Sequence, residues 1–63
     1  MPTPTVTTKE LSALEDQLSS EQTLITKYRD YAKRCQDTAL QTKCNQIASL
    51  HQKHYDTLVS YLS

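Results

Sequence analysis

The chain has 63 residues, no glycine, no tryptophan, and only two prolines, at positions 2 and 4. A chain of this length forms one domain with a small core, and the lack of glycine argues against a turn-rich β fold. Seven basic and seven acidic residues leave a formal net charge of zero, which offers no electrostatic footprint for nucleic acid or an anionic membrane. We therefore expect an all-α protein with neither of these as a partner.

The first predicted helix follows a tail of residues 1–6 (MPTPTV), which we expect to be flexible. Thr7 and Glu10 have the spacing of a capping box, and Val6 with Leu11 has that of a hydrophobic staple. Beyond them, residues recur at alternating intervals of three and four, which is typical of a heptad seam. This seam predicts a helix over residues 8–36 and contains Leu11, Leu14, Leu18, Glu21, Ile25, Tyr28, Ala32 and Cys35.

The second predicted helix begins after a break in the pattern near Gln36. Asp37 or Thr38 can cap it, and Thr38 with Gln41 has the spacing of a second capping box. The heptad pattern then resumes and predicts a helix over residues 38–62. Its seam contains Leu40, Cys44, Ile47, His51, His54, Leu58 and Tyr61.

The short connection predicts that residues 7–63 form an antiparallel helical hairpin. Pairing the seams outward from a turn near Asp37 places Glu21 opposite His54 and Ile25 opposite His51. Further apolar residues widen both seams. Helices with so wide a stripe need two neighbours each, so we expect two hairpins to pair as a homodimer into a four-helix bundle. The widening residues are Leu24, Tyr31, Ala48, Leu50, Tyr55 and Leu62.

Glu21, His51 and His54 are the acidic and basic residues of the two seams, and they fall in one region of the predicted core. An unpaired buried carboxylate is costly, so Glu21 needs a partner, a proton or a metal ion. In a symmetric dimer, two copies of these three residues would converge on the centre of the bundle. Histidines at positions i and i+3 of a helix can point at one ion, so the three residues are candidate ligands for a divalent metal ion, zinc or iron. The alternative is a metal-free hydrogen-bonded layer that fixes helix register. The sequence leaves both interpretations open.

Two stretches, TTKELSALEDQLSSEQTLITKYRDYAKRCQD and KCNQIASLHQKHYDTL, resemble the spore coat protein F family, small hairpin members of the ferritin-like superfamily. The resemblance implies a ferritin-like bundle, a spore-coat association with other coat proteins as partners, and a metal centre. Glu21 matches the glutamate of that centre's first helix, and His54 matches the histidine of its Glu-x-x-His motif. The glutamate of that motif falls at His51. Imidazole-rich sites suit zinc, copper, nickel or ferrous iron better than ferric iron, so oxidase activity ranks last among the functions considered.

The remaining sequence signals are weak. Cys35 and Cys44 lie in adjacent layers of opposite helices, too far apart for a disulfide, so we expect free thiols. No nucleophile triad and no phosphate-binding loop is present, so no catalytic residue is nominated. With no signal-peptide pattern and no apolar run of membrane-spanning length, the expected location is intracellular.

Overall fold

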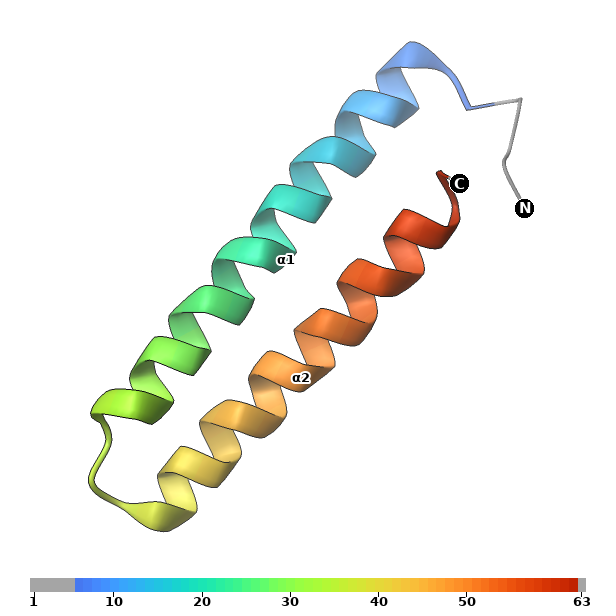
Figure 1. Cartoon of the computed structure of the whole chain (residues 1–63). Coiled ribbons are helices and arrows are strands. Elements are labelled where there is room, and N and C mark those ends of the chain that lie inside the picture. Colours follow the sequence, from blue (N-terminus) through green and yellow to red (C-terminus); the bar gives the residue numbers. More distant parts are fainter. Residues whose placement is uncertain (1–5, 63) are drawn as a thin grey trace.

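The computed structural model describes residues 6–62 and shows a helical hairpin. Helix α1 spans Thr8–Arg34 and helix α2 spans Thr38–Ser60, and the two lie side by side in opposite directions (Figure 1). The prediction of an all-α antiparallel hairpin is confirmed. The predicted flexible tail lies outside the described residues except for Val6.

The start of α1 is held by the predicted capping box. The backbone N–H of Glu10 donates to Oγ1 of Thr7 at 3.1 Å, and the backbone N–H of Thr7 donates to Oε1 of Glu10 at 3.0 Å. At the other end of α1, Lys33 and Arg34 occupy the last turn, where their positive charge suits the carbonyl end of the helix dipole. Local sequence signals therefore account for the start of this helix, and the charge of its last turn suits its end.

The turn between the helices occupies residues 35–37, so α1 ends at Arg34 rather than near residue 36. Asp37 caps α2, because its Oδ1 accepts a hydrogen bond from the backbone N–H of Leu40 at 3.0 Å. The predicted box between Thr38 and Gln41 does not form. The amide of Gln41 instead donates to the backbone carbonyl of Cys35 at 2.6 Å, which ties the first turn of α2 to the connection.

The core of one hairpin is small. Within residues 6–62, the buried apolar residues are Ile25, Ala32, Cys44 and Ala48, and no large side chain is fully buried. Small residues at the helix contact let the two backbones approach, but they cover little apolar area. Several large hydrophobic residues of the described chain stay exposed: Leu11, Tyr31, Leu40, Leu50, Val59, Tyr61 and Leu62.

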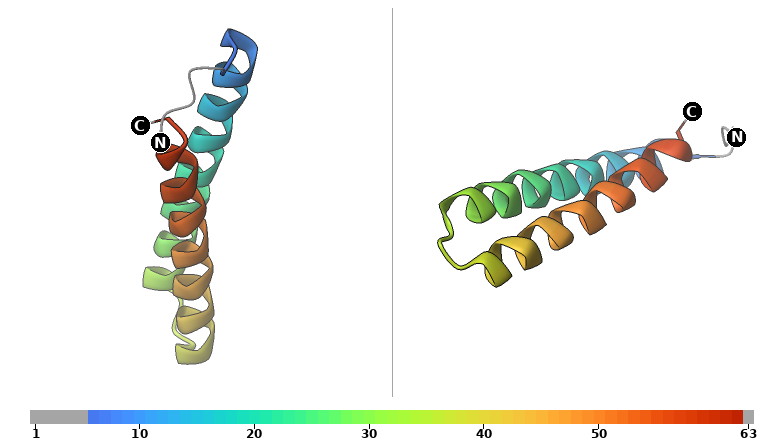
Figure 2. Two further views of the ribbon diagram at one scale, coloured as in Figure 1. Left: turned by 90° about the vertical axis from the view of Figure 1, so that its right-hand side faces the viewer. Right: turned by 60° about the horizontal axis from the view of Figure 1, so that its bottom comes forward.

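The hairpin is one helix thick, so it has two broad faces (Figure 2). On one side, the rings of Tyr28 and His51 stack across the helix contact. On the other side, Gln22 and Thr26 of α1 share a shallow depression with Gln52 of α2. Residues spaced by seven extend these sides along the helices. We define the apolar face as Leu24, Tyr31, Leu40, Ile47, Leu50 and Tyr61, and the polar face as Ser19, Thr26, Lys33, Thr42, Ser49 and Asp56.

Candidate metal centre

The structure brings the three predicted ligands together. Glu21 is the central residue of α1, and His51 and His54 lie one turn apart on the facing side of α2. Each residue offers one ligand atom, and these atoms all lie within 4.8 Å of one another. The heptad positions of the three residues explain this convergence, because seam residues of two packed helices face the same contact.

The pairing inside the cluster differs from the predicted layers. Nδ1 of His51 lies 2.6 Å from Oε1 of Glu21, whereas Nδ1 of His54, the predicted partner, lies 3.6 Å from the same oxygen. Side chains of packed helices interdigitate rather than meet head-on. Glu21 therefore sits between two successive turns of α2 and contacts a histidine from each.

Glu21 is buried, with only 6% of its surface exposed, yet both of its oxygens have partners. Oε1 faces the histidines, and Oε2 accepts a hydrogen bond from Nε2 of Gln17 at 2.9 Å. The hydrogen bond from His51 lowers the pKa of Glu21 below its ordinary value, outweighing burial, which raises that pKa. An ionised carboxylate can only accept hydrogen bonds, so Nδ1 of His51 carries the proton that it donates.

Aromatic rings frame the histidines. The ring of Tyr28 stacks on His51 with centroids 6.3 Å apart and planes at 13°, and Tyr31 meets Tyr28 edge-on at 6.0 Å. The rings of His51 and His54 meet edge-on at 5.5 Å. The ring of Tyr28 therefore lies against one face of the His51 ring.

Gln17 and the stacking of Tyr28 are the features that sequence reasoning missed. Gln17 lies four residues before Glu21, a spacing that supports hydrogen bonds between helical side chains. This spacing is visible in the sequence, but it indicates a role for Gln17 only once Glu21 is known to be buried. Tyr28 and His51 come from different helices, and their contact depends on the stagger between the helices.

The cluster opens toward the apolar face. The side chain of His54 is 49% exposed, that of His51 is 21% exposed, and that of Glu21 is 8% exposed. The carboxylate thus lies at the bottom of the site, with the imidazoles above it. His54 also falls in the seven-residue row of Leu40, Ile47 and Tyr61, so the site lies within an apolar surface.

The donor set fits a divalent transition metal. Two imidazoles and one carboxylate are a common zinc ligand set with one position left open. Tetrahedral bonds of 2.0–2.2 Å put ligand atoms about 3.3 Å apart. The 3.6 Å contact to His54 is close to that separation, whereas the 2.6 Å contact to His51 is a direct hydrogen bond. An ion between these atoms therefore requires a side-chain rotation at His51.

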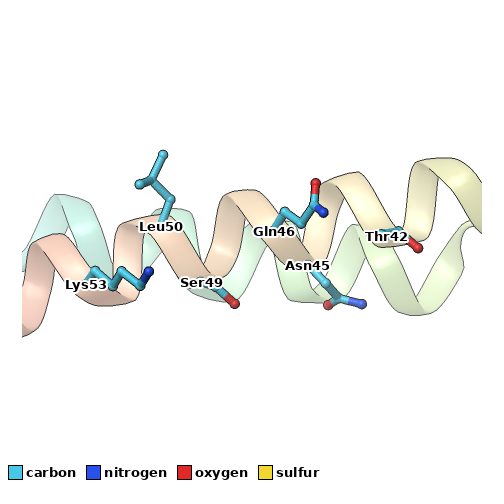
Figure 3. A pocket seen from close by; sticks show the side chains of 6 residues that line it. All are labelled: Thr42, Asn45, Gln46, Ser49, Leu50 and Lys53. Atoms are coloured by element: carbon cyan, nitrogen blue, oxygen red, sulfur yellow. The ribbon is translucent and has the colours of Figure 1, made fainter.

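A second depression of the described surface has a different character. Its lining residues, Thr42, Asn45, Gln46, Ser49, Leu50 and Lys53, all come from α2 (Figure 3). Because one helix supplies every lining side chain, nothing closes this depression from the other side. It brings together no cluster of titratable groups and offers no built site.

Other sequence predictions can be placed on the structure. Cys35 and Cys44 are free thiols; Cys44 is buried and Cys35 is half-buried. Neither helix within residues 6–62 is long and apolar enough to cross a membrane.

Comparisons of the chain with protein-family models, with curated proteins and with solved structures found no match. The resemblance to the spore coat protein F family therefore stays a prediction. Any assignment of function has to rest on the chemistry of the Glu21, His51 and His54 cluster.

Proposed function

We propose that this chain binds a divalent transition metal ion, zinc or ferrous iron, through Glu21, His51 and His54. The observation that carries the proposal is the convergence of one carboxylate and two imidazoles, from two helices, with ligand atoms within 4.8 Å. Imidazole nitrogen suits both ions, and a single carboxylate neutralises part of their charge. A bound ion would supply a fixed positive charge between the helices, and the residues of the site add no catalytic group to it.

We propose further that a second copy of the chain covers the apolar face and completes a ferritin-like four-helix bundle. Tyr31 is 47% exposed, Leu40 53% and Tyr61 55%, although each lies in a row of seam or flanking positions. Glu21 lies at the middle of α1, so a two-fold axis near this point sets the acidic first half of one copy's α1 beside the basic second half of the other's. A spore-coat setting, with other coat proteins as partners, belongs to the same proposal and rests on the sequence resemblance alone.

A second candidate function has its own supporting observation. The hydrogen bonds of Glu21 to His51, at 2.6 Å, and to Gln17, at 2.9 Å, already satisfy the carboxylate without an ion. No described buried side-chain nitrogen or oxygen lacks a hydrogen-bond partner. Under this alternative the protein is a structural assembly unit, and the Glu–His layer fixes the register of its helices.

Zinc titration of protein made without a histidine tag separates the two functions. We expect one Zn²⁺ per chain in competition with a chromogenic chelator. Removing a ligand in Glu21→Gln or His54→Gln should weaken the affinity by more than about 100-fold, because each change leaves only two protein ligands. Ferrous iron, titrated without oxygen, should bind more weakly than zinc, following the usual order of divalent metals.

Asp56→Asn is the matched control for Glu21→Gln. Asp56 is also a helical carboxylate that accepts a hydrogen bond from a glutamine four residues earlier, at 3.0 Å, but it lies on the polar face. Its loss should leave zinc affinity within about 2-fold of wild type, in line with the small effect of exposed substitutions. Wild-type protein that retains no zinc and shows no thermal shift with it would establish the register-fixing function instead.

A further inference from the structure

Gln17 belongs to the first half of α1, in the seven-residue row of Leu24 and Tyr31, and its side chain contacts the candidate metal centre. Its Nε2 donates to Oε2 of Glu21 at 2.9 Å. The other oxygen, Oε1, is the one that faces Nδ1 of His51 at 2.6 Å and Nδ1 of His54 at 3.6 Å. The two oxygens of one buried carboxylate therefore have separate partners on separate helices.

We propose that Gln17 is a positioning residue that turns Oε1 of Glu21 toward the two histidines and keeps Oε2 away from them. The terminal torsion of a glutamate side chain is broad and has no strong preference of its own. A hydrogen bond to one oxygen is therefore enough to fix this torsion, so that the second oxygen faces the site. This inference rests on the proposed function for its metal-binding consequence, but the positioning itself exists without an ion.

The consequence for a bound ion is that Glu21 acts through one oxygen. With Oε2 held by Gln17, the chain offers three ligand atoms, which suits a four-coordinate zinc ion with one open position. Manganese prefers six oxygen-rich ligands and gains more from a carboxylate that binds through both oxygens. Gln17 should therefore raise the preference of the site for Zn²⁺ over Mn²⁺ as well as its affinity.

The chain contains a matched control for this contact. Gln52 donates to Oδ1 of Asp56 at 3.0 Å, also from a glutamine to a carboxylate four residues later on a helix. Asp56 is exposed on the polar face and touches neither histidine. Substitution of Gln52 thus measures what such a pair contributes to a helix, without the contribution to the site.

The test compares Gln17→Met with Gln52→Met in the full chain. Methionine keeps the length and the helix propensity of glutamine but has no N–H to donate. We expect Gln17→Met to weaken Zn²⁺ binding about 10–100-fold, as loss of residues that orient metal ligands does, and to lower the ratio of Zn²⁺ to Mn²⁺ affinity. Gln52→Met should change neither quantity.

A double-mutant cycle and a metal-free measurement complete the test. In the Glu21→Gln background, Gln17→Met should have no further effect on zinc affinity, since the group it positions is gone. In metal-free protein, ring ¹⁵N shifts of His51 should move toward the tautomer protonated on Nε2 in Gln17→Met and stay unchanged in Gln52→Met.

Equal effects of the two glutamine substitutions, or full additivity with Glu21→Gln, would overturn the positioning role. If wild-type protein binds no zinc, the proposed function fails, and the ¹⁵N shifts of His51 alone decide whether Gln17 orients Glu21. Failure of the positioning role and failure of metal binding therefore give different experimental results.

Discussion

At the scale of single residues, Glu21 is the buried charged residue of the described chain, and its neighbours offset the free-energy cost of burying its carboxylate. Burial penalises the carboxylate, while His51 at 2.6 Å and Gln17 at 2.9 Å hydrogen-bond its ionised form. The net result is a pKa of Glu21 below its ordinary value. The lowered pKa makes the stability of the protein depend on pH in a predictable direction.

We expect the ionised Glu21 to stabilise the fold fully above the ordinary glutamate pKa. That contribution should be lost as the pH falls through the lowered pKa of the folded state, because the unfolded chain then binds the proton more readily. The difference in unfolding free energy between wild type and Glu21→Gln should therefore be largest near neutral pH and shrink in acid. Urea unfolding at a series of pH values, with EDTA present to remove metal, measures this difference. A gap that stays constant or widens in acid would contradict the proposed network.

Sequence reasoning reached the site residues but not the contacts between them. Glu21, His51 and His54 could be selected because they interrupt apolar seams, and seam membership follows from spacing alone. Which histidine lies nearer Glu21 depends on the stagger of the two helices, which spacing does not determine. The same stagger decides that the ring of Tyr28 stacks on that of His51.

At the scale of the helices, local hydrogen bonds set most boundaries. The box between Thr7 and Glu10 involves residues three apart, so the sequence alone could predict it. The end of α1 at Arg34 and the bond from Gln41 to the carbonyl of Cys35 could not be predicted in the same way. Both depend on the path of the turn, where Asp37 and Thr38 were competing caps.

The N-terminal cap supplies a prediction at this scale. Thr7→Ala removes the hydroxyl that accepts the backbone N–H of Glu10, so it should lower the unfolding free energy by about 1 kcal/mol. Thr8→Ala is the control, since residue 8 lies inside the helix and alanine suits that position. Urea unfolding followed by circular dichroism, at one fixed protein concentration, compares the variants. Equal unfolding free energies of Thr7→Ala and Thr8→Ala would mean that the N-terminal end of α1 frays and that the capping box does not stabilise the fold.

At the scale of the whole molecule, the small core of one hairpin leads us to expect that it needs a second copy for stability, as small domains often need added support. Its core consists of Ile25, Ala32, Cys44 and Ala48, and the last three are small. Several exposed leucines and tyrosines, among them Tyr31, Leu40, Leu50 and Tyr61, lie on the apolar face, around the opening of the candidate metal centre. Pairing through that side would bury the leucines and tyrosines and would also close the site against water.

Leu40 and Ala39 provide a sharp test of this pairing. Both lie in the first turn of α2, where an added glutamate interacts favourably with the helix dipole, so neither change should destabilise an isolated hairpin. Leu40 belongs to the apolar face, whereas Ala39 is an exposed neighbour that points elsewhere on the helix. We expect wild type and Ala39→Glu to sediment as dimers at micromolar concentration. Leu40→Glu should weaken dimerisation by at least about 10-fold, equivalent to ~1.4 kcal/mol, because it sets a charge on a covered surface.

The Leu40→Glu variant also tests whether dimerisation affects the metal site. If a second copy closes the opening above His54, Leu40→Glu should also weaken zinc binding at concentrations where wild type is a dimer, although residue 40 is several turns from the site. Raising the protein concentration should restore both dimer and affinity together, since the two equilibria are then coupled by mass action. Ala39→Glu should bind zinc as wild type does. A wild-type protein that is a folded monomer at tens of micromolar would contradict the proposed pairing. A zinc affinity that is the same in monomer and dimer would contradict the proposed link between assembly and the metal site.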